Sequence, residues 1–329
     1  MTLLEVRELA VDAGGIPVVR RLSFSIDPGE RVGLIGESGS GKTMVALAIM
    51  GLLPEGLAQS GSVTFEGTEL TNLSDRRYSE LRGNRLAMVF QEPMTALDPL
   101  MRVGKQVTDA IRLHRRVGRG EARQRMHSLL ARVGFSNPKE QARRFPHQLS
   151  GGQRQRVVIA IALACDPALV LADEPTTALD VTVQAQVLDL LQTLVAEESS
   201  ALLLISHDLA VVSSVCDRIL VMYGGTLVES CTTAELLAAP RHPYTVALLQ
   251  TSRGVGGGAA AGQLPTIPGS VPPLGGFPSG CVFRGRCSRE QARCQEVPAL
   301  VGAEHQVACW YPVESSGAVP APRSRPHSS

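Results

Sequence analysis

The sequence lacks an excess of either charge. Of its 329 residues, 32 are Lys or Arg and 31 are Asp or Glu, so the formal net charge is +1. A protein that binds nucleic acid generally needs a basic surface, so this balance argues against a general nucleic-acid binder. The apolar fraction of 44% and the charged fraction of 19% indicate a globular chain. At about 150 residues per domain, the length allows roughly two domains.

Long hydrophobic runs are also missing. The longest covers residues 157–165, whereas a membrane-spanning helix needs about 20 apolar residues. The N-terminal MTLLEVRELA has neither the basic nor the apolar region of a secretory signal peptide. Seven cysteines are too few for a disulfide scaffold. We therefore expect a protein of a reducing compartment that does not cross a membrane by itself.

Short apolar runs alternate with helical segments along the chain. Residues 31–36, 168–172 and 201–205 have the continuous apolar character of buried parallel strands. Residues 43–53, 153–164 and 183–197 are expected to be helices. This alternation predicts an α/β fold with a mainly parallel sheet.

A glycine-rich segment follows the first of these strands. GESGSGKT at residues 36–43 matches the pattern G-x-x-x-x-G-K-[ST] between a strand and a helix. Glycines let backbone N–H groups surround phosphate oxygens, and the helix N-terminus adds a positive dipole end. Lys42 is expected to reach the β- and γ-phosphates, and Thr43 to bind Mg²⁺. The expected phosphate-binding residues are Gly36, Glu37, Ser38, Gly39, Ser40, Gly41, Lys42 and Thr43.

A second apolar strand ends in two acids. In LVLADE at residues 169–174, Asp173 is placed to hold Mg²⁺ and Glu174 to polarise the attacking water as a general base. Beside a phosphate-binding loop, this pair predicts a nucleoside triphosphatase.

LSGGQRQR at residues 149–156 is a second anion-binding turn at the start of a helix. One nucleotide does not need two such turns in one chain, so the second is expected to contact a nucleotide held by another subunit. With these motifs in this order, residues 1 to about 250 resemble the ATP-binding-cassette (ABC) ATPases. The resemblance implies an added antiparallel β layer and a helical subdomain at about 76–160. It also implies ATP contacts by Ser150, Gly151, Gly152 and Gln153.

Three further residues take their roles from this resemblance. Gln91 in VFQEP resembles the lid residue that contacts Mg²⁺ and the membrane partner. Asp180, with Ala178 and Leu179, resembles the D-loop, and His207 in LLLISHD resembles the switch histidine that contacts the γ-phosphate. One feature departs from the family, because residues 11–17 (VDAGGIP) hold no aromatic side chain to stack on adenine.

Three longer segments of the sequence indicate which branch of the ABC ATPases the chain resembles. Residues 91–106, 176–191 and 240–249 resemble the peptide/nickel importer ATPases. The resemblance implies a head-to-tail pair of related ATPase chains, two permeases and an extracytoplasmic substrate-binding protein at the cytoplasmic face of the inner membrane. Uptake of di- or oligopeptides is the leading interpretation. The alternatives are nickel or another small solute, a soluble non-transport cassette ATPase, and a P-loop phosphotransferase.

The chain changes character after residue 250. Residues 251–314 are expected to form a C-terminal extension, beginning with the glycine-rich linker 254–262, and residues 315–329 a disordered tail. Cys281, Cys287, Cys294 and Cys309 lack the C-x2-4-C pairs of zinc sites, so their spacing is a weak metal signal. The segment resembles the C-terminal region of dipeptide-type ATPase subunits, which implies a [4Fe–4S] cluster on these cysteines. Zinc and unligated thiols or disulfides are the alternatives.

Overall fold

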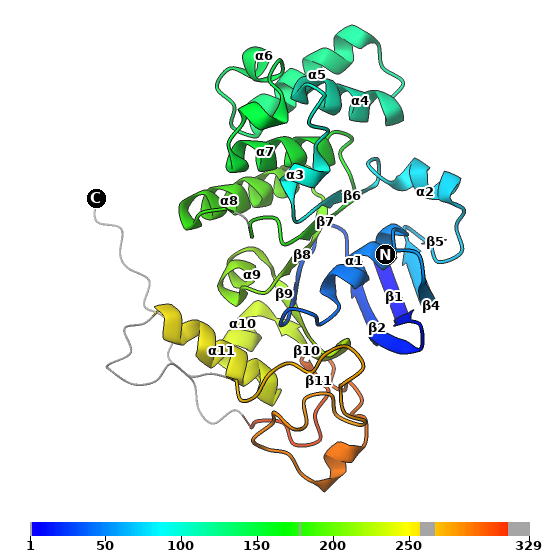
Figure 1. Cartoon of the computed structure of the whole chain (residues 1–329), viewed down its shortest axis with the longest axis vertical. Helices are drawn as coiled ribbons and strands as arrows, with labels where there is room; N and C mark the ends of the chain where they lie inside the picture. Colours follow the sequence, from blue (N-terminus) through cyan, green and yellow to red (C-terminus); the bar gives the residue numbers. More distant parts are fainter. Residues whose placement is uncertain (1, 178, 257–266, 315–329) are drawn as a thin grey trace.

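The computed structural model describes residues 2–177, 179–256 and 267–314. Its centre is a seven-stranded sheet with the order β11-β10-β9-β3-β8-β7-β6 (Figure 1). Five of these strands run parallel to one another: β3 (Arg31–Ile35), β6 (Leu86–Val89), β7 (Leu169–Asp173), β8 (Ala201–Ser206) and β9 (Arg218–Tyr223). Strands β10 (Thr226–Thr232) and β11 (Gln306–Val307) add antiparallel pairs at one edge. The prediction of an α/β fold with a mainly parallel sheet is confirmed.

The central strands form because they consist almost entirely of apolar residues that can be buried on both faces. All five residues of β7 and all six of β8 are buried. A parallel strand covered on both faces requires this continuous apolar run instead of an alternating one. The runs expected at 168–172 and 201–205 therefore correspond to β7 and β8, to within one residue.

A four-stranded antiparallel sheet packs beside the central one in the order β2-β1-β4-β5. Its strands are β1 (Leu4–Ala13), β2 (Ile16–Ile26), β4 (Leu57–Phe65) and β5 (Thr68–Glu69). Helix α1 (Lys42–Met50) lies between the sheets and contacts β2 and β7 (Figure 1). A single apolar core joins the three, including Val11, Ile49 and Leu203. This core fixes the glycine-rich turn before α1 against both sheets.

Helices form a layer above the other edge of the central sheet (Figure 1). They are α3 (Pro93–Ala96), α4 (Val103–His114), α5 (Arg119–Arg132), α6 (Pro138–Gln141), the 3-10 turn Pro146–Gln148 and α7 (Gly151–Ala162). Helix α2 (Asp75–Leu81) lies apart from this layer, beside β5, and its Tyr78 packs in the core shared with α1 (Figure 1). Strand β6 also falls within the stretch 76–160 that was expected to be a helical subdomain, but it pairs with β7 in the central sheet.

The remaining helices cover the central sheet. They are α8 (Val181–Glu197), α9 (Leu209–Val215), α10 (Thr233–Ala238) and α11 (Pro243–Gly256). Helix α1 ends at Gly51 in the left-handed conformation, earlier than the expected residue 53. Helix α11 includes the first residues of the expected linker 254–262. The rest of that linker and the expected tail 315–329 lie outside the described residues.

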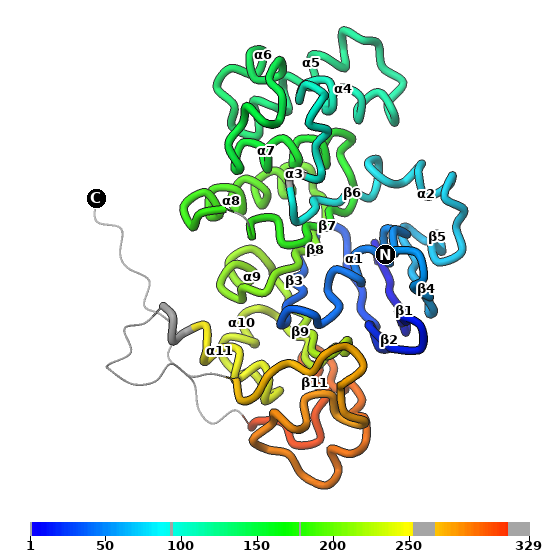
Figure 2. Tube along the Cα trace, in the orientation of Figure 1, coloured from blue at the N-terminus to red at the C-terminus, as the bar shows by residue number. Residues whose placement is uncertain are grey.

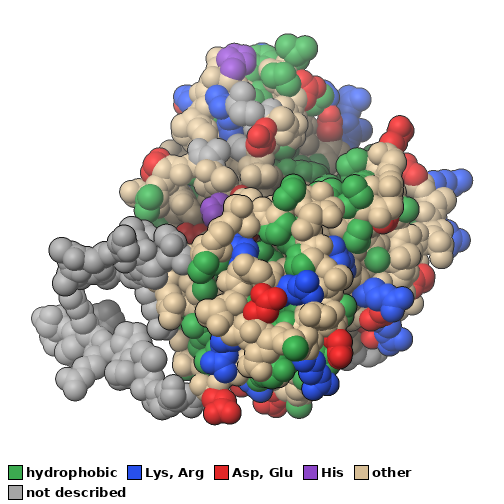
Figure 3. All heavy atoms as spheres, turned by 60° about the horizontal axis from the view of Figure 1, so that its bottom comes forward, with side chains coloured by type: hydrophobic (Ala, Val, Ile, Leu, Met, Phe, Trp, Pro, Cys, Tyr) green, Lys and Arg blue, Asp and Glu red, His purple; other side chains and the backbone are tan. Residues whose placement is uncertain are grey.

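The C-terminal extension, residues 267–314, packs beneath β9 and β10 (Figure 2). Besides the 3-10 turn Ala292–Gln295, it contributes β11, which pairs with β10. The fully buried Glu229 of β10 anchors it. Its Oε1 lies 2.7 Å from Nε2 of His305 and accepts the amide of Arg241 at 2.6 Å, and its Oε2 accepts the amide of His242 at 2.9 Å. On the face that Figure 3 turns forward, acidic and basic side chains are interspersed, as the near-zero net charge implies.

His242, at this anchor, is held neutral. It is fully buried, its Nδ1 accepts the backbone amide of Tyr244 at 3.1 Å, and burial lowers its pKa to about 3. The unfolded chain takes up a proton near the ordinary value of about 6.5, whereas the folded chain does not until far lower pH. The stability that neutral His242 contributes is therefore present above about pH 6.5 and is lost as the pH falls from there toward 3.

We expect the free energy of unfolding to fall between pH 6.5 and pH 5 by about 2 kcal/mol through His242 alone. Urea denaturation of the parent chain and of a His242→Asn variant measures this contribution. The asparagine Oδ1 can still accept the Tyr244 amide but does not titrate. If both chains lost equal stability over this range, His242 would not be the group responsible.

Candidate functional site

The glycine-rich turn closes around the buried ammonium of Lys42. Its Nζ donates to the carbonyl oxygens of Gly36 at 2.8 Å and Glu37 at 3.1 Å, and lies 3.5 Å from Oγ of Ser40. Gly41 precedes α1 with φ of 94°, a conformation that a side chain would strain. A Cβ there would also lie 2.8 Å from the Val18 carbonyl oxygen. The segment therefore has the closed turn that the sequence predicted for a phosphate-binding loop.

Acidic groups surround this lysine. Burial lowers the pKa of Lys42, and the nearby carboxylates of Glu174, Asp173 and Glu37 oppose that shift. These charges favour the ammonium form, which is the form that attracts phosphate.

Asp173 lies at the end of β7, facing the start of α1. It is 3% exposed, and its Oδ1 is buried with no hydrogen-bond partner among the described residues. Burial raises the pKa of Asp173, while a hydrogen bond from Thr43 opposes the shift. A buried carboxylate oxygen without a donor is costly unless a ligand satisfies it, and carboxylate and hydroxyl oxygens suit Mg²⁺. The residues present therefore fit a magnesium ion at Thr43 and Asp173.

Three side chains from separate segments contact the carboxylate of Glu174. Gln91 Nε2 donates to Oε2 at 3.2 Å, Thr177 Oγ1 donates to the same oxygen at 2.8 Å, and His207 Nδ1 lies 3.2 Å from Oε1. Gln91 follows β6, Glu174 follows β7 and His207 follows β8, so the carboxyl ends of three adjacent parallel strands bring them together. Glu174 also has a φ of 44°, a strained backbone conformation that is concentrated at functional sites.

The second anion-binding turn begins α7. Ser150 caps this helix, since its Oγ accepts the amide of Gln153 at 3.3 Å while Gln153 Oε1 accepts the amide of Ser150 at 3.1 Å. A Cβ at Gly152 would lie 2.5 Å from Cγ1 of Val183, so only glycine allows α7 to approach the start of α8 this closely. Asp180 caps α8 by accepting the amide of Val183 at 3.0 Å. Ala178 of the expected D-loop lies outside the described residues.

The structure thus gathers Gln91, Glu174 and His207 into one cluster, while Ser150 and Asp180 begin two neighbouring helices. Sequence reasoning missed two contacts of this site. Thr177 could have been suspected from its position three residues after Glu174. The hydroxyl of Tyr244 accepts the backbone amide of Glu37 at 2.9 Å, but the two residues lie 207 positions apart, and no sequence pattern indicates that contact.

Comparison with known proteins decides the family. The family model described as ABC transporter matches residues 19–177, and the one described as Oligopeptide/dipeptide transporter, C-terminal region matches residues 228–294. The Probable D,D-dipeptide transport ATP-binding protein DdpD of Escherichia coli (strain K12) is 47% identical over 91% of this chain and 92% of its own length. The Oligopeptide transport ATP-binding protein AppD of Bacillus subtilis (strain 168) is 46% identical over 89% and 90%.

The chain belongs to the ABC transporter family of ATP-binding proteins. Among solved structures, the dimeric ATP-binding cassette MJ0796, in a post-hydrolysis state with ADP and Pi, superposes with a TM-score of 0.62 at 28% identity. The match covers 70% of this chain and 98% of that one. The prediction of an ABC ATPase is confirmed, and ATP and Mg²⁺ are the ligands that the family implies for this chain.

The prediction of a [4Fe–4S] cluster on this ABC ATPase was wrong. Within the described ranges, the one group of three or more His, Cys, Asp or Glu side chains with ligand atoms inside 4.8 Å of one another is Glu229, Cys231 and His305. It contains none of the four expected ligands, Cys281, Cys287, Cys294 and Cys309. The relatives are transport ATP-binding proteins whose names indicate no such cluster.

The four cysteines line one small cavity next to Phe283 and Trp310, and all are free thiols. Burial raises the pKa of Cys281 and Cys287, and that of Cys309 to about 11, so without a metal these sulfurs are held as thiols. The expectation failed because resemblance and spacing do not specify how closely the sulfurs approach one another. Cys165, Cys216 and Cys231 are also free thiols, and all three are buried.

The group Glu229, Cys231 and His305 is a hydrogen-bonded anchor and not a metal centre. The distance between Oε1 of Glu229 and Nε2 of His305 is 2.7 Å, whereas two ligand atoms on a tetrahedral zinc ion lie about 3.3 Å apart. Both oxygens of Glu229 also accept backbone amides. Burial raises the pKa of Cys231 to about 12.

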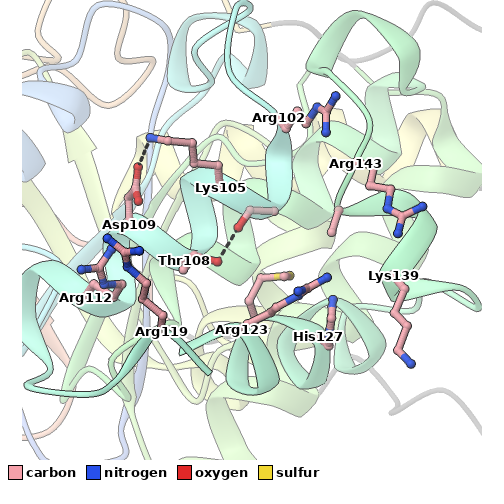
Figure 4. A pocket seen from close by; sticks show the side chains of 13 residues that line it. Arg102, Lys105, Thr108, Asp109, Arg112, Arg119, Arg123, His127, Lys139 and Arg143 are labelled. Carbon is pink, nitrogen blue, oxygen red and sulfur yellow. Dashed lines mark hydrogen bonds and ion pairs between the residues drawn. The ribbon is translucent and has the colours of Figure 1, made fainter. Parts of the chain in front are cut away.

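A basic hollow lies in the helical layer between α4, α5 and α6 (Figure 4). Several of its lining arginines belong to the Arg-rich stretch 112–125. Figure 4 shows Arg112 and Arg119 together at one end of the hollow and Lys139 pointing away from it, so these cations do not converge on one point. Burial, with the charges of Arg123 and Lys139, lowers the pKa of His127. The arrangement fits a solvated helix face.

Proposed function

We propose that Glu174 is the general base of ATP hydrolysis in this chain. The contact set around its carboxylate carries this proposal. Gln91 and Thr177 fix one oxygen, and the second oxygen faces His207. A carboxylate oriented in this way can accept a proton from a water molecule that attacks the γ-phosphate, while His207 contacts the same phosphate.

The loop Gly36, Glu37, Ser38, Gly39, Ser40, Gly41, Lys42 and Thr43 would hold the phosphates of ATP. The buried ammonium of Lys42 supplies a fixed positive charge, and backbone N–H groups at the start of α1 supply donors. Thr43, Asp173 and Gln91 would hold Mg²⁺, which supplies charge neutralisation of the phosphates. The unpaired, buried Oδ1 of Asp173 supports this assignment.

A second ATPase chain would complete the site. Ser150, Gly151, Gly152, Gln153 and Asp180 would contact the nucleotide held by the loop of the other chain in a head-to-tail pair. Two observations support this arrangement. The turn at Ser150 is exposed at the start of α7, a different element from α1. The cassette MJ0796, which has the same fold, is dimeric.

The transport function follows from the relatives. DdpD and AppD are named for D,D-dipeptide and oligopeptide transport, and the C-terminal family model is named for oligopeptide/dipeptide transporters. ATP hydrolysis by this chain would power uptake of di- or oligopeptides through two permease subunits fed by an extracytoplasmic substrate-binding protein. The described residues contain no helix long and apolar enough to cross a membrane. The chain would bind its permeases peripherally, at the cytoplasmic face of the inner membrane, with a related ATPase chain as its partner.

Reconstitution tests the transport proposal. Proteoliposomes holding this chain, its partner ATPase, the permeases and the substrate-binding protein are expected to take up peptide only with ATP and Mg²⁺. A Glu55→Gln variant, changed in an exposed loop, is the matched control and should transport like the parent. ATP-dependent uptake of nickel or another solute without peptide would refute the peptide assignment.

A further inference from the structure

Arg286 of the C-terminal extension reaches into the phosphate-binding loop. Its Nη1 lies 2.6 Å from Oε2 of Glu37 and its Nη2 lies 3.2 Å from Oε1, so the guanidinium makes a two-point contact with the carboxylate. The two residues are separated by 249 positions in the sequence. The side chain of Arg286 is 8% exposed, which shields the pair from water and salt.

The rest of the guanidinium is fixed as well. Nη1 also lies 3.1 Å from the hydroxyl of Tyr223, and Nε donates to the carbonyl oxygen of Pro268 at 2.9 Å. The guanidinium carbon lies 5.6 Å from the centre of the Tyr223 ring and 6.0 Å from that of Phe283. Arg286 is therefore held in one orientation by groups from β9 and from the extension itself.

Aromatic packing links this arginine to the backbone of the loop. Tyr223, Tyr244 and Phe283 pack with ring centres 4.9 to 5.4 Å apart. The hydroxyl of Tyr244 accepts the backbone amide of Glu37 at 2.9 Å. Glu37 is thus restrained at its backbone by α11 and at its carboxylate by the extension.

The contact with Arg286 neutralises a negative charge, that of Glu37, inside the phosphate-binding loop. An unpaired carboxylate in a loop that binds polyphosphate would weaken binding, because like charges repel strongly where water is excluded. Glu37 is the second residue of the loop, and its own carbonyl oxygen accepts a hydrogen bond from Lys42. Arg286 supplies the opposite charge within hydrogen-bond distance, and no other cation forms a salt bridge with Glu37 in the described part of the chain.

We infer that Arg286 is a positioning residue for ATP binding, through which the C-terminal extension neutralises and orients Glu37 in the phosphate-binding loop. The inference rests on the proposed placement of the ATP phosphates at this loop. It gives the extension a part in the ATPase site itself, beyond any contact with the transporter.

Steady-state ATPase kinetics of four chains test this inference: the parent, Arg286→Gln, Glu37→Gln and the double variant. Arg286→Gln should raise KM for ATP roughly tenfold and change kcat by less than about threefold, because the unpaired Glu37 carboxylate repels the nucleotide. In the Glu37→Gln background the same arginine substitution should raise KM by less than about threefold. Arg289→Gln, in an exposed residue of the same extension, is the matched control.

Two results would overturn the inference: an unchanged KM in Arg286→Gln, or an equal rise in both backgrounds, which would mean that Arg286 only holds the extension. If Arg286→Gln does not fold, Arg286→Lys, which keeps the charge but cannot bond both oxygens, gives the same comparison with a smaller rise. A Lys42→Ala variant distinguishes failure of the proposed phosphate site from failure of the role of Arg286. If Lys42→Ala leaves the equilibrium affinity for a fluorescent ATP analogue unchanged, the phosphate site itself is misplaced. If Lys42→Ala weakens that affinity while Arg286→Gln leaves KM unchanged, only the role of Arg286 fails.

Discussion

Replacing Glu174 with glutamine is expected to lower ATP turnover by roughly 100- to 1000-fold while ATP still binds. The amide has nearly the shape of the carboxylate, and its oxygen can still accept hydrogen bonds from Gln91 and Thr177. It cannot take a proton from water, so the loss falls on the chemical step. The phosphate-binding loop is not altered by this change.

Phosphate release under steady-state conditions measures the turnover, and equilibrium binding of a fluorescent ATP analogue measures the affinity. The Glu55→Gln variant removes an exposed carboxylate from a loop and should behave like the parent in both assays. Undiminished turnover in the Glu174→Gln variant would show that another group activates the water.

Removal of the Lys42 ammonium is expected to weaken ATP binding by roughly 10- to 100-fold, the cost of losing a charge-assisted contact. The effect is large because Lys42 lies among the carboxylates of Glu37, Asp173 and Glu174. Lys42→Ala would leave those negative charges facing the phosphates without the cation that balances them. Turnover should fall with binding.

Nucleotide titration of Lys42→Ala and of Lys139→Ala separates this effect from a general loss of positive charge. Lys139 belongs to the rim of the basic hollow and points away from it (Figure 4). Lys139→Ala should bind ATP like the parent. Equal affinities for all three chains would contradict the assignment of the phosphate site.

The local parts of this site could be predicted from sequence because each is a continuous segment whose residue types are set by what it must do in the fold. Residues 36–43 must close around anions, and the apolar run before Asp173 must be a buried strand. The cluster of Gln91, Glu174 and His207 follows once these strands are known to be parallel neighbours, since their carboxyl ends lie at one edge of the sheet.

Contacts between distant segments could not be predicted in this way. Arg286 lies in a loop-rich extension with no periodic pattern, and only tertiary packing places it on Glu37. The two-residue strand β11 likewise exists because β10 offers it a partner. The iron–sulfur prediction failed for the same reason, because a sequence motif does not report the distances between Cys281, Cys287, Cys294 and Cys309 in the folded chain.

The head-to-tail site is the central claim. Mixing two inactive variants of this chain, without the related partner chain, tests it directly in the pairs that this chain forms with itself. Lys42→Ala disables the phosphate-binding loop, and Gly151→Asp places a negative charge at the first residue of α7. The helix dipole favours an acid there, and the added Cβ would lie 3.3 Å from Cδ2 of Leu179. Each variant alone should be inactive. A mixed pair should contain one intact site, made from the loop of the Gly151→Asp chain and the turn of the Lys42→Ala chain.

An equal mixture is expected to recover about a quarter of the parent ATP turnover measured at the same total concentration, because half of the pairs are mixed and each has one working site of two. A mixture as inactive as the separate variants, under conditions where the parent hydrolyses ATP, would contradict the two-chain site.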